Sequence, residues 1–393
     1  MKSRKVLTVV LWATASLMSV SAQLPIPSDG SDGALNVLAG ETVVIDLRQA
    51  ITGPWNASNA AHAGQGVYDP EKWAVVFKYS SVNIEGSVTF TNHPTRAPVV
   101  WLVKDNVRIS GTVDLSGQPA VTGLEALIHA EPGPGGFRGG AGGTPGSGQG
   151  MGPGGGVVGT YQTSYGNPQI VPLIGGSGGQ AHGPAGGGPG GGAILIACAG
   201  EIEINGRLIA LGSIGAIPGA TGTGSGGAIR LIATRIAGGG EVGAYSGGAP
   251  SSLGNAGRIR IETFQLSQGL KLNPETIAVP PANPPILWPA ESAPSVRVLR
   301  VDGIDSPAEP TAPLARAADI ALQNDKAVEI FIESKNFPLE GFVELKVTHK
   351  FGAGSPSWKG ATYVSGDFSR ALWKVVDVFP GGFNVLQARA TLP

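Results

Sequence analysis

The sequence predicts an all-β protein, in which a parallel β-helix with a glycine-rich insertion is followed by a small antiparallel β-sandwich of immunoglobulin-like architecture. Three observations support this prediction. Short segments with alternating apolar residues and a central glycine recur in the first two thirds of the chain. Glycine accounts for 63 and proline for 31 of the 393 residues. After a proline-rich stretch, alternating apolar and polar segments follow, a pattern typical of half-buried strands.

Composition and charge exclude several classes of protein. Hydrophobic residues make up 41% of the chain, more apolar material than a disordered polar chain contains. The glycines follow no strict three-residue period, which excludes collagen. With 27 basic and 28 acidic residues, the chain has no strong field to attract nucleic acid or an anionic membrane. We therefore expect no nucleic-acid partner.

Residues 1–22 have the features of a secretory signal peptide. Lys2, Arg4 and Lys5 precede an apolar stretch over residues 6–18, and small residues at 20–22 indicate cleavage before Gln23. No other run reaches the ~20 apolar residues of a membrane-spanning helix. We expect a secreted or cell-surface protein without a membrane span after cleavage.

The chain has one cysteine, Cys198, so an internal disulfide is excluded. This cysteine follows an apolar run over residues 193–197. Its surroundings indicate a buried, unreactive thiol, because reactive cysteines lie in exposed, electropositive sites. Packing and hydrogen bonds must then hold the exported protein together.

Residues 23–270 contain two kinds of repeated segment. Residues 82–90, 107–115 and 202–210 share alternating apolar positions and a central glycine. A second pattern recurs at residues 192–196, 227–231 and 257–261. One such unit cannot bury its apolar face alone, whereas stacked units share an interior. The repeats therefore predict a parallel β-helix.

The alignment of the glycine-centred segments predicts which residues become neighbours. If the second and third segments lie on adjacent coils, Arg108 and Glu203 occupy equivalent outward positions. Ile109 and Ile204 then stack inside. Adjacent strands lie about 4.8 Å apart, so both pairs would be in contact.

Residues 117–191 interrupt these repeats. Glycine fills 27 of the 62 positions from 131 to 192. Such a segment is either a flexible linker or closely packed backbone, since glycine allows chains to approach each other closely. The packed alternative is favoured because the apolar residues 170–174 would otherwise be exposed.

Residues 271–294 contain seven prolines and predict a semi-rigid linker. The segments 296–301, 328–332, 342–347, 372–376 and 384–389 beyond it alternate apolar and polar residues. Strands at this density, separated by turn residues, are typical of a sandwich, here over residues 295–393. No cysteine pair supports more than an architectural likeness to immunoglobulin domains.

The chain resembles the glycine-rich secreted bacterial proteins that have a β-helix body and a small C-terminal β-sandwich. The resemblance is carried by residues 28–33, 97–103, 132–143, 225–233 and 257–262. It covers most of residues 28–264 and is weaker in the C-terminal domain. Most members of this family have no assigned function. The resemblance therefore implies a fold and provides no catalytic residue.

Polysaccharide lyases and hydrolases also use β-helices, and they need two carboxylates at one cleft. In the aligned segments the outward columns are Asn83, Arg108 and Glu203; Glu85, Ser110 and Asn205; and Thr89, Asp114 and Ile209. No column contains two acids, and residues 115–270 contain neither Asp nor Lys. We assign no catalytic residue and do not expect an enzyme.

The sequence also gives no metal or cofactor site. The histidines show no metal-binding spacing; they are His62, His93, His129, His182 and His349. Asp29 and Asp32 resemble part of a calcium loop but lack its third acid and terminal Glu. We expect Asx hydrogen bonds in a turn there instead.

We therefore expect an exported, non-enzymatic structural or adhesive β-solenoid protein whose partners are extracellular polysaccharide or cell-envelope components. The alternative is a polysaccharide-binding module or a polysaccharide-degrading β-helix protein. Aromatic residues that could stack on sugars are Trp55, Trp73, Trp101, Tyr161 and Tyr165. Trp73 and Trp101 lie in apolar strands, where core packing is expected.

Overall fold

The computed structural model describes residues 23–143, 148–155, 165–247, 256–314, 317–323, 326–350, 357–379 and 381–392. The predicted signal peptide lies outside these residues. The described chain is all-β, with only three short 3-10 turns, η1 (Leu47–Gln49), η2 (Ala60–His62) and η3 (Gly123–Leu127). None of its helical turns has the length and apolar character needed to cross a bilayer.

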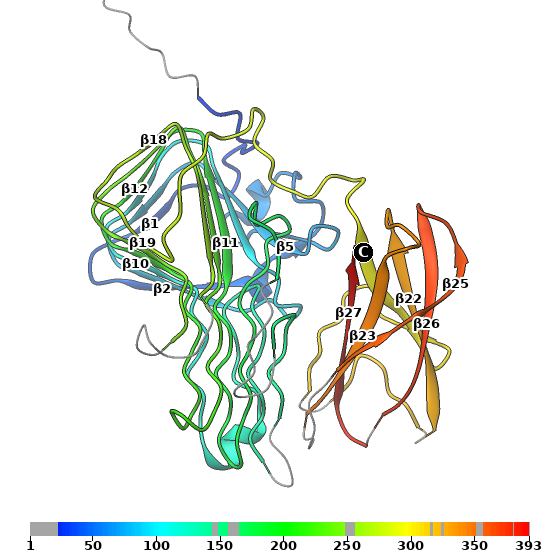
Figure 1. Cartoon of the computed structure of the whole chain (residues 1–393). Helices are drawn as coiled ribbons and strands as arrows, with labels where there is room; N and C mark the ends of the chain where they lie inside the picture. The colour runs from blue at the N-terminus through cyan, green and yellow to red at the C-terminus, as the bar shows by residue number, and fades with distance from the viewer. Residues whose placement is uncertain are drawn as a thin grey trace, which may run out of the picture.

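Three sheets built largely of parallel strands form the body, on the left of Figure 1. The first contains β1 (Leu35–Val37), β6 (Val82–Ile84), β9 (Val107–Ile109), β12 (Glu201–Ile204), β15 (Arg235–Ala237) and β18 (Gln265–Leu266). The second contains β2 (Thr42–Asp46), β7 (Ser87–Thr91), β10 (Thr112–Asp114), β13 (Arg207–Ile209), β16 (Glu241–Gly243) and β19 (Lys271–Asn273). The third contains β3 (Ile51–Thr52), β4 (Val67–Asp69), β5 (Ala74–Tyr79), β8 (Val99–Val103), β11 (Ala193–Cys198), β14 (Ala228–Ile232) and β17 (Arg258–Glu262).

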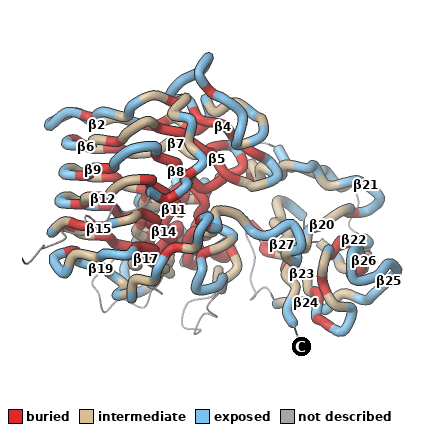
Figure 2. The backbone as a smooth tube through the Cα atoms, turned by 90° about the horizontal axis from the view of Figure 1, so that it is seen from above, coloured by how far each residue is buried: buried red, intermediate tan, exposed pale blue. Residues whose placement is uncertain are grey.

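From β5 onward the chain visits the three sheets in turn and adds one strand to each per circuit. Figure 2 shows these circuits stacked in rows, with the buried residues toward the middle. β4 and β5, near the first circuit, pair antiparallel and are the exception to the parallel pairing of strands in these three sheets. β19 pairs with β16, so the second sheet extends into residues 271–273, which the sequence assigned to the linker.

The strand register confirms the neighbours predicted from the repeats. Glu203 pairs with Arg108 and Ile204 with Ile109 between β12 and β9. The Arg108 Nε atom lies 3.5 Å from a Glu203 carboxylate oxygen. Ala193, Ala228 and Arg258 likewise align across β11, β14 and β17. The stacking of the repeats is therefore as predicted.

The interior between the three sheets is an aliphatic core with few aromatic side chains. Ile109 and Ile204 are fully buried within it. Cys198 is also buried, and burial raises the pKa of its thiol to about 12. Its Sγ atom lies 2.7 Å from the carbonyl oxygen of Asp105. The prediction of a buried thiol is confirmed.

The stacked isoleucines should be energetically coupled. We expect Ile109→Ala and Ile204→Ala each to lower the free energy of unfolding by about 2–5 kcal/mol, because each leaves a cavity. In a double-mutant cycle measured by chemical denaturation, the two losses should differ from additivity by about 0.5 kcal/mol or more. Ile330→Ala in the C-terminal region is the control, because Ile330 is equally buried but packs in a separate cluster. Strict additivity of the Ile109 and Ile204 losses would contradict the contact.

The glycine-rich insertion is packed backbone. We call residues 132–143, 148–152, 175–192 and 222–227 the glycine array. Its segments run side by side away from the sheets, at the lower left of Figure 1. The Gly140 amide donates to Gly179, Gly187 to Gly140 and Gly188 to Gly222, all at 2.9 Å. Because most of these glycines are buried, the packed alternative holds for the described part of the insertion.

The C-terminal region consists of two antiparallel sheets. One contains β20 (Ser295–Val301), β21 (Ile304–Asp305), β22 (Ala327–Lys335), β25 (Thr362–Gly366) and β26 (Arg370–Val378). The other contains β23 (Phe342–His349), β24 (Trp358–Gly360) and β27 (Asn384–Thr391). The five predicted strands are all present, whereas β21, β24 and β25 were not predicted. A separate cluster of buried side chains lies between the sheets.

The C-terminal sheets dock against the glycine array. Arg96, which precedes β8, and Arg138 of the array donate to the carbonyl oxygens of Thr311 and Ala312. From the opposite side, the Lys346 ammonium donates to the Gly152 carbonyl at 3.2 Å. These charged groups bind backbone carbonyls, so the contact is specified by hydrogen bonds as well as by apolar packing.

Candidate functional site

The outward charges of the body form ion pairs between neighbouring circuits. Arg207 lies 3.0 Å from Glu241, and Arg235 pairs with Glu201. Together with the pair of Arg108 and Glu203, these contacts place an arginine beside an acid. Exposed pairs of this kind contribute about 0.2–1 kcal/mol each. The pairs of Arg108 and Arg235 lie on the first sheet and that of Arg207 on the second, and in each of them the acid is beside an arginine.

The sequence predicted no catalytic residue, and Asp114, one of the outward acids of its repeats, lies at the end of β10. Asp114 accepts a hydrogen bond from the Ser116 amide at 2.8 Å, as a turn residue does. Within the described segments, no three His, Cys, Asp or Glu side chains could jointly hold a metal ion.

The five histidines lie in separate surroundings. His93 is buried and its ring stacks on Tyr68 with centroids 4.0 Å apart. His129 is buried against the array, where it contacts the Gly139 carbonyl, and desolvation lowers its pKa to about 4. His182 and His62 are exposed, and His349 contacts Asn384. A solvated His182 is what the sequence predicted.

The Asp29–Asp32 turn is held by backbone amides. Asp29 accepts from the Ser31 amide at 2.9 Å, which confirms the predicted Asx hydrogen bond. The buried Asp32 carboxylate accepts from the amides of Gly64 at 3.0 Å and Lys78 at 2.7 Å. These donors occupy oxygens that a cation would need.

The aromatic candidates contribute to packing. Trp101 is fully buried, as predicted, whereas Trp73 is half-buried and donates to the Thr95 carbonyl at 3.1 Å. Trp55 packs against Trp288 with ring centroids 5.5 Å apart. Tyr165 donates to the Gly175 carbonyl at 2.6 Å, and Tyr161 lies outside the described residues.

The far end of the glycine array carries a cluster of exposed aliphatic side chains that sequence reasoning missed. We call this cluster the apolar tip; it consists of Val121, Leu124, Leu127, Ile128, Ile214 and Ile217. Leu124 is 85% and Ile128 65% exposed. The turn η3, at the bottom of Figure 1, contributes Leu124 and Leu127.

Backbone hydrogen bonds join the segments that form the apolar tip. Gly186 donates to the Val121 carbonyl and accepts from the Ala216 amide, both at 3.0 Å. The aliphatic segments around Val121 and Ala216 are therefore held on either side of the same segment of the array, residues 175–192. Glu125 and His129 are the only ionisable side chains in residues 116–130. The tip is thus apolar, nearly uncharged and fixed to an ordered base.

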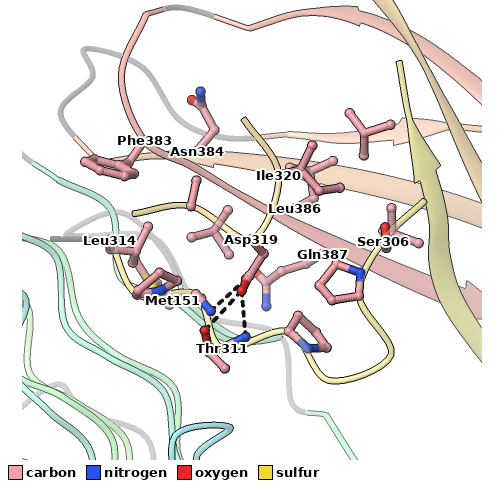
Figure 3. Close-up of a pocket in the computed structure, with 18 of the residues that line it drawn as sticks. Met151, Ser306, Thr311, Leu314, Asp319, Ile320, Phe383, Asn384, Leu386 and Gln387 are labelled. Carbon is pink, nitrogen blue, oxygen red and sulfur yellow. Dashed lines mark hydrogen bonds between the residues drawn. The ribbon is translucent and has the colours of Figure 1, made fainter. Parts of the chain in front are cut away.

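A hollow lies between the array and the C-terminal sheets. This cavity has a volume of about 610 Å³ (Figure 3). Residues 306–314 and 317–323, which we call the strap, cross it. The strap is folded by Asp319, whose carboxylate accepts from the Thr311 amide and hydroxyl at 3.0 Å and from the Ala312 amide at 2.8 Å.

No protein-family model, curated protein or solved structure matches this chain. The apolar tip and the cavity are therefore interpreted from their own residues and geometry. The tip could bury aliphatic surface against a partner. The cavity could enclose a small molecule.

Proposed function

We propose that the chain is an exported, non-enzymatic adhesive protein that presents the apolar tip on a rigid support. In this proposal the three parallel sheets form a parallel β-helix and the C-terminal sheets an immunoglobulin-like sandwich. The signal-peptide pattern at residues 1–22 supports export to the cell surface or medium. The exposure of Leu124 and Ile128 at the end of the array is the observation that carries the proposal.

Six exposed aliphatic side chains lie where the array ends, and further exposed apolar side chains lie on the C-terminal sheets, among them Val364, Val376 and Val378. Single exposed hydrophobic residues are ordinary, but clustered ones indicate interaction sites. Backbone hydrogen bonds hold the array, so little conformational entropy is lost when the tip engages a surface. This arrangement supports a structural solenoid in which the glycine array carries a contact surface at its far end.

The chemistry of the tip favours an apolar component of a cell envelope as its partner. A polysaccharide surface would call for hydrogen-bonding groups and accessible aromatic faces. The described aromatic candidates instead pack against other side chains or donate to backbone carbonyls. Aliphatic side chains with few ionisable residues beside them in the sequence suit an apolar, weakly charged surface.

Adsorption to apolar particles tests this proposal. Binding of the full chain to octadecyl-coated silica should fall by at least about tenfold when Leu124 and Ile128 are both changed to Ser. Burial of a single Leu or Ile side chain contributes about 1.5–3 kcal/mol, and about 1.4 kcal/mol corresponds to a factor of ten. Binding to bare silica should change little.

The matched control is Ile277→Ser, which removes an aliphatic side chain that is 88% exposed and lies outside the tip. This variant should adsorb like the wild type. Equal losses in both variants would contradict a specific role for the tip. Release of reducing sugar from a polysaccharide panel by the wild type would contradict the non-enzymatic proposal.

A further inference from the structure

We propose that the cavity between the glycine array and the C-terminal sheets binds one neutral, largely apolar small molecule that carries a hydrogen-bond donor. This site is separate from the apolar tip, and the proposal stands independently of the adhesive function. Size, lining, charge balance and one unpartnered acceptor each restrict the ligand.

The cavity has the size and position of a small-molecule site. Its volume of about 610 Å³ lies in the range of such sites, which often occur where domains meet. The lining is mostly apolar and comes from three parts of the chain. Phe137 and Met151 belong to the array, Ile320 and Leu322 to the strap, and Phe379 and Phe383 to the connection between β26 and β27. Figure 3 shows these parts meeting around the cavity.

The charged residues around the cavity already have partners. Arg96 and Arg138 share Glu131, with nitrogen–oxygen distances of 3.0 and 2.6 Å.

Arg297 pairs with an acid that Arg370 also contacts, whereas Asp319 is held by amide and hydroxyl donors. Arg297 lies 2.9 Å from Glu333, and Asp319 accepts hydrogen bonds within the strap. A charged ligand would have to break one of these pairs or remain unpaired at a cost in free energy. The charge balance therefore favours a neutral ligand.

One polar atom of the lining has no partner. The side-chain oxygen of Gln387, on β27, is buried and accepts no hydrogen bond in the described structure. Figure 3 shows this side chain at the cavity, near the strap. A buried acceptor without a donor is unfavourable. If the side chain turns toward the cavity when a ligand binds, a ligand O–H or N–H would satisfy this acceptor, so the ligand should carry a donor.

Two fluorescent probes with the same ring system test the charge and polarity of the site. N-phenyl-1-naphthylamine is neutral and apolar and has one N–H donor. 8-Anilino-1-naphthalenesulfonate adds a sulfonate to the same skeleton. We expect saturable, one-to-one binding of the neutral probe to the full chain, and binding of the sulfonate at least about tenfold weaker. Equal affinities, or no saturable signal with the neutral probe, would overturn the proposal.

Variants locate the bound probe. Gln387→Leu should weaken binding of the neutral probe by about threefold to tenfold, because the N–H of the probe would lose an acceptor. The control Gln265→Leu changes an exposed glutamine on β18, outside the cavity lining, and should have no effect.

Filling the cavity should abolish binding of the neutral probe. Ser306→Trp and Ala318→Trp each place a large ring on the strap side of the cavity. Ser365→Trp, at an exposed position of β25 outside the lining, is the matched control. Circular dichroism identifies which variants fold, and two filling variants are made so that one misfolded protein does not end the test. Unchanged binding in a folded filling variant would overturn the proposal.

Discussion

Replacing Gly111 with alanine is expected to lower the free energy of unfolding by more than about 4 kcal/mol, an exceptional loss for one methyl group. A Cβ atom at this position would lie 1.8 Å from the Gly86 carbonyl oxygen and 2.6 Å from that of Glu85. These are backbone atoms, and the Gly86 carbonyl accepts from the Thr112 amide at 2.8 Å. Relief of the clash therefore requires separating two circuits. Urea denaturation of the full chain, followed by circular dichroism, measures the loss.

The chain offers a matched control in the equivalent turn of a later circuit. A Cβ at Gly239 meets no atom within 4 Å, so Gly239→Ala should change the stability by less than about 1 kcal/mol. Gly206→Ala should reproduce the effect of Gly111→Ala, since its Cβ would lie 1.9 Å from the Gly111 carbonyl. A Gly111→Ala protein as stable as the control would contradict the close stacking of the turns.

The sequence was informative about the stacked circuits because their constraints repeat. Each circuit needs inward aliphatics and a glycine where the turns approach each other, and both recur in the printed sequence. The circuit of β15 and β16 was missed because Gly238 stands at the inward position where Ile204 stands in the preceding circuit. The loss of one isoleucine was enough to break the alternation.

The fold of the glycine array could not be predicted from the composition, because glycine provides no side-chain pattern. Which carbonyl receives which amide depends on segments that are distant in sequence. Gly188, for example, donates to Gly222 and accepts from Gly179. The aliphatic residues of the apolar tip can be read in the sequence, but their exposure depends on how the array folds. The tip was therefore missed although its residues are conspicuous.

The cavity depends on contacts across even longer separations. Arg138 binds the carbonyl of Ala312, which is 174 positions later in the chain. No local pattern links an arginine in a glycine-rich segment to a backbone oxygen in a distant strap. The charge balance that favours a neutral ligand could consequently not be predicted from the sequence, because it depends on which residues become neighbours in the fold.

The second large effect concerns the array itself. Gly190→Ala would place a Cβ 1.9 Å from the Gly176 carbonyl oxygen and 2.2 Å from its carbon. We expect local loss of the array at a cost of more than about 3 kcal/mol, because neither backbone can move without breaking hydrogen bonds on its other side. In hydrogen exchange monitored by mass spectrometry, peptides from residues 175–192 should be protected in the wild type and exchange rapidly in the variant. Peptides from β12 should remain protected in both.

Gly186→Ala is the control within the same segment, because its nearest neighbour, the Val121 carbonyl, would lie 3.4 Å from the new Cβ. It should keep the wild-type exchange pattern. Rapid exchange of residues 175–192 in the wild type would instead show that the insertion is a flexible linker. Gly190→Ala should also reduce adsorption to octadecyl-coated silica without changing any residue of the apolar tip. That result would separate the need for an ordered support from the need for aliphatic side chains, since a flexible array would present the same side chains at a higher entropic cost.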